Sequence, residues 1–119
     1  MAYDQYTADR ITNILEDKKT PFVSKKMMGG LCFMVDGKMA CWIHYDKKRK
    51  TDLLMARVGQ ENYLDLLERD HSLPMDFTGR AMKGYVFVKP EGYDSSEDLE
   101  FWMARVLEFN PFAKASKKK

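Results

Sequence analysis

The clearest local structural signal in this sequence is LCFMVDGKMACWIHY, residues 31–45. Asp36 and Gly37 divide it into two apolar segments, and an Asp-Gly pair supplies the positive φ angles that a two-residue type I′ turn requires. Because the flanking segments are rich in aromatic and aliphatic residues, the sequence predicts a β-hairpin with strands over 31–35 and 38–45.

The two-residue loop also fixes the pairing of the predicted strands. Val35 then faces Lys38 and, counting outward, Cys32 faces Cys41. One face of the hairpin would carry Leu31, Phe33, Val35, Ala40 and Trp42. The other would carry Cys32, Met34, Met39, Cys41 and Ile43, which form the candidate dimer or core face. Since both faces are apolar, each needs a cover other than water.

Helical spacing and capping residues predict three helices, and short apolar runs predict three further strands. Asp4 and Ser95 suit the N-cap positions of the first and last helices, and Pro21 and Pro111 block their continuation. The predicted helices cover about 4–18, 60–69 and 95–110, and the further strands cover 22–28, 53–58 and 85–89.

The order α-β-β-β-β-α-β-α, without an internal repeat or a long linker, predicts one two-layer α+β domain. We expect a mostly antiparallel five-stranded sheet with helices packed on it, a domain over 1–112 and a mobile basic tail over 113–119. If the helices cover one face of the sheet, a second copy of the chain is the economical cover for the other, which predicts a homodimer. The alternative is a monomer in which loops and the C-terminal region wrap that face.

Composition excludes several classes of protein. With 45% hydrophobic and 32% charged residues among 119, the chain has the make-up of an ordinary globular domain. No apolar run approaches the roughly 20 residues of a membrane helix, and the N-terminus MAYDQYTADR lacks the pattern of a secretion signal. Two cysteines are too few for a disulfide-stapled secreted scaffold. We therefore expect no membrane association and a cytoplasmic location.

Two basic runs stand out within the net charge of +2. Lys47, Lys48, Arg49 and Lys50 follow the hairpin, and four further lysines lie at 114 and 117–119. The rest of the chain has more acidic than basic residues. The first run is a candidate nucleic-acid contact that would supply phosphate affinity without reading sequence, and the alternative is a solvated turn between two strands.

The loop before the last predicted strand holds the other charged candidates. In PMDFTGRAMKGYVFV, residues 74–88, Asp76, Arg80 and Lys83 form a candidate site for an anion or a partner carboxylate. Backbone N–H groups near glycines can form an anion-binding nest, which favours this reading. The alternative is an ordered connection in which Asp76 bonds its own backbone.

Catalytic and metal-binding patterns are missing from the sequence. It has no G-x-S-x-G, no phosphate-binding G-x-x-x-x-G-K-[ST] and no paired C-x-x-C motif. His44 lies three positions from Cys41 in a predicted strand, so the two side chains should point to opposite faces. Triad chemistry has little to work with, because neither His44 nor His71 stands beside a nucleophile. We expect a non-enzymatic protein without a metal site or cofactor.

Three segments resemble, in order, the signatures of the TfoX N-terminal domain family. They are KKMMGGLCFMVDGKMACWI at 25–43, LLMARVGQENY at 53–63 and PMDFTGRAMKGYVFV at 74–88. The matching elements are the Met-x-Gly-Gly of 27–30, the Arg-Val-Gly of 57–59 and the Met-x-Phe-x-Gly-Arg-x-Met-x-Gly loop of 75–84. Family members commonly have Phe where this chain has Met28, and the preceding basic residue is often Arg where this chain has Lys.

The resemblance implies an α/β fold of the secretion-chaperone-like kind with antiparallel sheets. It also implies a regulatory association, with no established catalytic residues or cofactor. The two-domain competence regulators that name the family continue into a helical C-terminal domain, and we expect these 119 residues to hold only the first domain. The expectation is thus a stand-alone domain that acts on an unidentified protein partner. The alternative is a nucleic-acid-associated regulator of transcription or competence that uses the basic turn at 47–50 and the lysines of the C-terminal tail.

Overall fold

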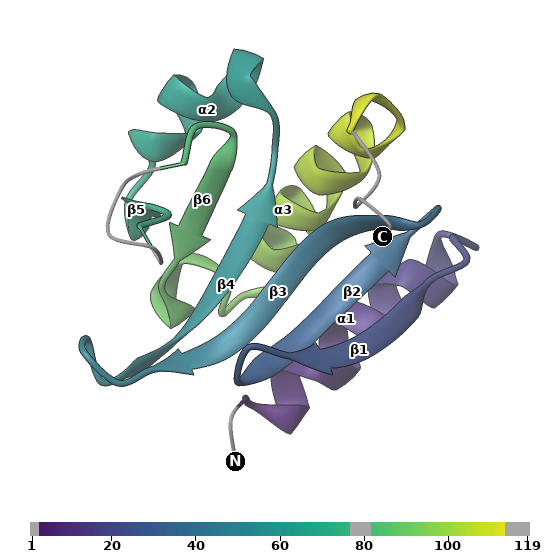
Figure 1. Ribbon diagram of the computed structural model, residues 1–119, viewed down its shortest axis with the longest axis horizontal. Helices are drawn as coiled ribbons and strands as arrows, with labels where there is room; N and C mark the ends of the chain where they lie inside the picture. The colour runs from purple at the N-terminus through teal and green to yellow at the C-terminus, as the bar shows by residue number, and fades with distance from the viewer. Residues whose placement is uncertain (1–2, 77–81, 114–119) are drawn as a thin grey trace.

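The computed structural model describes residues 3–76 and 82–113. Within these ranges the chain forms three α-helices and six strands (Figure 1). The helices are α1 (Gln5–Asp17), α2 (Gln60–Leu67) and α3 (Ser96–Phe109). The strands are β1 (Val23–Met27), β2 (Gly30–Val35), β3 (Lys38–Asp46), β4 (Thr51–Arg57), β5 (Ser72–Pro74) and β6 (Tyr85–Val88). The predicted tail over 113–119 falls outside the described residues except for Ala113, which is buried.

The strands form one sheet in the order β1-β2-β3-β4-β6-β5, and every neighbouring pair is antiparallel. The predicted α+β class is confirmed. The sheet has one strand more than predicted, because β5 pairs with the end of β6 through Ser72 and Val88. β5 has only three residues and ends in a proline, so it carries no alternation of apolar and polar residues that could reveal it.

The two predicted helix caps are present. The Asp4 carboxylate accepts hydrogen bonds from the Thr7 amide at 3.3 Å and from the Thr7 hydroxyl at 2.7 Å. The Ser95 hydroxyl accepts one from the Asp98 amide at 3.0 Å. These bonds satisfy amide groups that the first turn of a helix leaves without a partner, and they fix where α1 and α3 begin.

The hairpin register departs from the prediction after two pairs. Val35 pairs with Lys38 and Met34 with Met39, as predicted, but Phe33 then pairs with Cys41. Ala40 is therefore an extra residue on β3, which is the definition of a β-bulge. One extra residue reverses the facing of every side chain beyond it, since side chains alternate with a period of two.

The bulge corrects the predicted face of Cys32, Met34, Met39, Cys41 and Ile43. Cys32 faces Trp42 across the strands, so the predicted pairing of the two cysteines is wrong. Cys41 and Ile43 belong to the core on one side of the sheet. Cys32, Met34 and Met39 lie on the opposite side, where Trp42 joins them.

The sheet buries apolar residues on both faces, as predicted. The larger cluster includes the buried apolar residues of all three helices, and Figure 1 shows α1 and α3 behind the sheet. We call the opposite side the methionine face, because methionines recur on it. Its buried residues are Cys32, Trp42, Leu53, Met55, Met75 and Phe87, with Met27, Met34, Met39, Leu73 and Tyr85 packed beside them. No residue of a described helix belongs to this cluster.

Contacts between α1 and the segment before α3 join two parts of the chain that are far apart in the sequence. Nη2 of Arg10 donates to the carbonyl oxygens of Tyr93, Asp94 and Ser95 at 3.1, 2.9 and 3.2 Å. Ile11, on the same helix, is fully buried.

None of the helices in the described ranges is long and apolar enough to cross a membrane.

Candidate functional site

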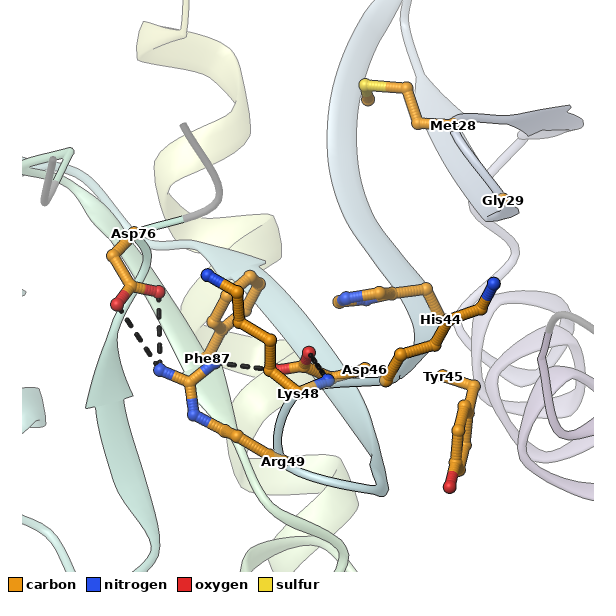
Figure 2. A pocket seen from close by; sticks show the side chains of 10 residues that line it. Met28, Gly29, His44, Tyr45, Asp46, Lys48, Arg49, Asp76 and Phe87 are labelled. Atoms are coloured by element: carbon orange, nitrogen blue, oxygen red, sulfur yellow. Dashed lines mark hydrogen bonds and ion pairs between the residues drawn. The ribbon is translucent and has the colours of Figure 1, made fainter. Parts of the chain in front are cut away.

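A pocket of about 710 Å³ opens at one end of the methionine face. It is lined by residues 28–29 of the turn between β1 and β2, by 44–46 at the end of β3, by 47–49 of the next turn, and by Asp76 and Phe87. Figure 2 shows these side chains around the space, with Asp76 and Arg49 on one side and Met28 and Gly29 on another. Four separate segments of the chain therefore build the site.

Stacked rings form the apolar part of the pocket. The imidazole of His44 lies 4.1 Å from the Trp42 ring, centroid to centroid, and the two planes differ by only 7°. Phe87 lies 5.5 Å from the same imidazole. Nε1 of Trp42 donates to the carbonyl oxygen of Met27 at 3.1 Å, which holds the indole and the β1–β2 turn together. These contacts hold the rings of Trp42, His44 and Phe87 in place.

Burial decides the charge of His44. The side chain is almost wholly buried, which disfavours the charged form and lowers its pKa below the ordinary value of 6.5. The Asp46 carboxylate opposes this effect and the Arg49 guanidinium adds to it. The imidazole is therefore neutral at neutral pH.

Arg49 forms the charged wall of the pocket. Its Nη1 bonds Oδ2 of Asp46 at 2.6 Å, and its Nη2 lies 3.3 Å from each carboxylate oxygen of Asp76. Burial alone would raise the pKa of Asp46, but the hydrogen bonds from Arg49 and the Lys48 amide, with the charge of Arg49, lower it overall. The same bonds raise the pKa of Arg49. The Arg49 guanidinium therefore forms ion pairs with the carboxylates of both Asp46 and Asp76 (Figure 2).

The structure joins two candidate sites that the sequence analysis treated separately. Arg49 of the basic turn and Asp76 of the Pro/Gly-rich loop bond each other on the same pocket. Lys47 and Lys48 also line the pocket, and they and Lys50 are exposed with no ion pair within the described ranges. The predicted nucleic-acid run is thus divided into one bound arginine and three exposed lysines.

The two remaining candidate residues of the Pro/Gly-rich loop are Lys83 and Arg80. Lys83 is exposed in the turn before β6 and does not line the pocket. Arg80 lies outside the described residues. Among the residues that the structure describes, no group of three or more potential metal ligands comes together.

Six pocket residues are not among the site candidates from the sequence, namely Met28, Gly29, His44, Tyr45, Asp46 and Phe87. Met28 was noted only as a departure from a family pattern, His44 only as a weak metal ligand, and Phe87 only as an apolar strand residue. The alternation of β6 does predict which face Phe87 occupies, but the facing of His44 depends on the bulge at Ala40. No local signal in the sequence marks that bulge.

The glycines of the three signature segments have structural roles around this site. Gly29 turns the chain with φ of +76°, and Gly30 begins β2 beneath the Trp42 indole. The carbonyl oxygen of Gly84 accepts hydrogen bonds from the amides of Val58 at 2.9 Å and Gly59 at 3.1 Å. The second signature segment is therefore bonded to the third, and the first shapes the pocket.

Comparison with protein families finds a match over most of the chain. The model of the TfoX N-terminal domain matches residues 14–110, which is most of the chain and includes all three signature segments. No curated protein and no solved structure matches the chain significantly.

Proposed function

Because the chain belongs to the TfoX N-terminal domain family, we propose that it is a non-enzymatic interaction domain that works as a homodimer. The family match supports a regulatory or interaction domain in general. The finer proposal, association of two copies through the methionine face, rests on the composition and register of that face.

The observation that carries the proposal is a row of apolar side chains across three neighbouring strands. Val23 on β1 pairs with Met34 on β2, and Met34 pairs with Met39 on β3. Directly paired residues point to the same side of a sheet, so the three side chains lie next to one another on the methionine face. Val23 is 58% exposed, and both methionines are partly exposed. We call this row the methionine patch.

The face around this patch suits a protein partner. Six of the nine methionines lie on the face or its adjoining turn, namely Met27, Met28, Met34, Met39, Met55 and Met75. Methionine side chains are flexible and polarizable, so they adapt to an opposing surface. The patch lies beside the hairpin turn at Asp36 and Gly37, at the opposite end of β2 from Gly30 and the pocket.

Light scattering with a paired set of variants tests the homodimer. The chain should give twice its mass of 13.9 kDa at tens of micromolar protein. Val23→Glu combined with Met39→Glu should give the monomer mass, because it places charge on the patch in each copy. Tyr6→Glu with Leu64→Glu is the matched control, since both side chains are 70% exposed and belong to helices. Circular dichroism melts check that each variant is folded.

Two results would overturn this proposal. One is a wild-type chain that stays monomeric up to hundreds of micromolar. The other is a folded patch variant that dimerises as well as the wild type and the control.

The non-enzymatic part of the proposal is supported by the lining of the pocket. Among the residues that the structure describes, its lining includes no cysteine, serine or threonine, and the histidine that lines it is neutral and stacked on an indole. The two cysteines are free and buried on opposite sides of the sheet, which supports a reducing, cytoplasmic setting as part of the same proposal.

Contact with nucleic acid is the second candidate function. Three exposed lysines at one end of the molecule support it, namely Lys47, Lys48 and Lys50. Binding to a generic duplex should then weaken steeply with salt, and changing all three to Gln should reduce the slope. The control changes three exposed lysines elsewhere, Lys18, Lys25 and Lys26, to Gln. Equal slopes for the two triple variants would argue against this candidate.

A further inference from the structure

We propose that the pocket at the end of the methionine face binds a small aromatic carboxylate. This inference does not depend on dimerisation, because the pocket and the methionine patch lie at opposite ends of β2. It assigns a ligand class to a site that the family match leaves without one.

The size and shape of the pocket fit a small molecule. Its volume of about 710 Å³ lies within the range of roughly 300–1,000 Å³ that is usual for such sites. The pocket draws on two turns, a strand end and the segment after β5, so its walls come from several sides. Trp42 and Arg49 hold three of these segments in place through the bonds described above.

The aromatic and thioether side chains of the pocket favour a ligand that has an aromatic ring. Figure 2 shows the His44 side chain directed into the space between Met28 and Asp76. His44 is backed by the Trp42 ring on one side, and Phe87 lies close by. Planar groups gain from stacked or edge contacts with such rings, and a thioether such as that of Met28 packs well against an aromatic edge.

The charged side chains of the pocket favour a ligand that carries a negative charge. Within residues 3–76 and 82–113, the lining has three cationic side chains and two carboxylates, and Arg49 bonds both carboxylates. Lys47 and Lys48 then remain as cations without an ion pair among the described residues. A ligand carboxylate can pair with either ammonium group at the rim of the pocket.

The same wall disfavours phosphate and metal ions. Phosphate carries more negative charge than a monocarboxylate, so it would be repelled more strongly by Asp46 and Asp76, and the guanidinium of Arg49 is already bonded to both of these carboxylates. A cation would have to displace Arg49 from both carboxylates. A monoanion with an aromatic ring satisfies both parts of the pocket.

A three-probe titration tests the inference on the intact chain. Indole-3-acetate carries ring and charge, indole carries only the ring, and acetate carries only the charge. The readouts are the methyl signal of Met28 and the indole N–H signal of Trp42 in NMR spectra. Saturable shifts of both signals with indole-3-acetate are expected, with weaker binding of indole and no saturable shift with acetate.

Matched lysine variants distinguish binding at this pocket from nonspecific binding elsewhere on the protein. Lys47→Gln with Lys48→Gln should weaken binding of indole-3-acetate about threefold to tenfold, since exposed ion pairs contribute modestly. Lys25→Gln with Lys26→Gln, an exposed pair on β1, should leave it unchanged. Absence of a saturable Met28 shift at millimolar indole-3-acetate would overturn the inference. Equal binding by both double variants, or by indole and indole-3-acetate, would do the same.

Discussion

Gly30→Ala should be among the most damaging small substitutions in this protein. A Cβ at Gly30 would meet the carbonyl oxygen of Ile43 in hard overlap, and would lie 2.7 Å from both Cβ of His44 and Nε1 of Trp42. The first obstacle is backbone, and the other two belong to buried residues. The indole would therefore have to leave the carbonyl of Met27, to which it donates at 3.1 Å.

The magnitude follows from two effects. Overpacking of a well-packed core costs about 1–3 kcal/mol. Losing a partly buried hydrogen bond adds about 1 kcal/mol. We therefore expect Gly30→Ala to lower the free energy of unfolding by about 2–4 kcal/mol, a large share of the 5–15 kcal/mol that is typical of a domain.

Gly29→Ala is the matched control, because a Cβ at Gly29 meets nothing within 4 Å. Its cost arises only from the left-handed backbone at φ of +76° and should be about 1–2 kcal/mol. Urea unfolding followed by circular dichroism measures both variants. In a Trp42→Phe background the cost of Gly30→Ala should shrink, since Nε1 is gone. Equal unfolding midpoints for the Gly29 and Gly30 variants would refute the steric reasoning.

Three further predictions concern buried polar and titratable groups. Asn110→Ala should lower the free energy of unfolding by about 1–3 kcal/mol in thermal melts, because it removes the buried hydrogen bond that the Asn110 amide donates to the carbonyl of Val35; an unchanged melting temperature would contradict this. The Asp46 carboxyl should titrate below the ordinary pKa of 3.8 in carbon-detected NMR, and Arg49→Gln should raise its midpoint. Since its pKa is lowered on folding, Asp46 stabilises the protein above the unfolded-state pKa, and this contribution disappears as pH falls through the folded-state pKa; a midpoint at or above 3.8 in the wild type would oppose this. Burial raises the pKa of Cys32 to about 11 and that of Cys41 still further, so both thiols should react slowly with a disulfide reagent in the native protein and rapidly in denaturant; fast native labelling would show that the sheet opens.

Much of the fold could be predicted because its signals are local. Asp4 and Ser95 mark the starts of two helices, and Asp36 with Gly37 marks the hairpin turn. Each of these residues acts on its immediate neighbours, so its effect does not depend on the rest of the fold. The strand over Ser72–Pro74 escaped prediction because its only support is the pairing with β6, far along the chain.

The site was predicted in pieces but not assembled. Composition identified Arg49 and Asp76 as candidates, yet the ion pair between them depends on how the sheet brings two distant segments together. The facing of His44 depends on the bulge at Ala40, where tertiary packing overrides the register that the turn alone would set. Apolar residues at successive positions of the strands predicted that both faces of the sheet are apolar, and the bulge determines which residues occupy each face.

Arg10 donates three hydrogen bonds to residues 93–95, and we call these contacts the clasp. The clasp affects where an expression fragment of this domain can begin. Arg10 and Tyr93 are 83 positions apart, whereas the family model begins only at residue 14, inside α1. A fragment trimmed to the matched region would lack the Asp4 cap, the fully buried Ile11 and all three bonds from Arg10. Contacts between positions so far apart carry a loop-closure entropy cost, which the burial of Ile11 and the bonds of Arg10 must offset. Expression boundaries for this domain should therefore follow the clasp and not the limits of sequence similarity.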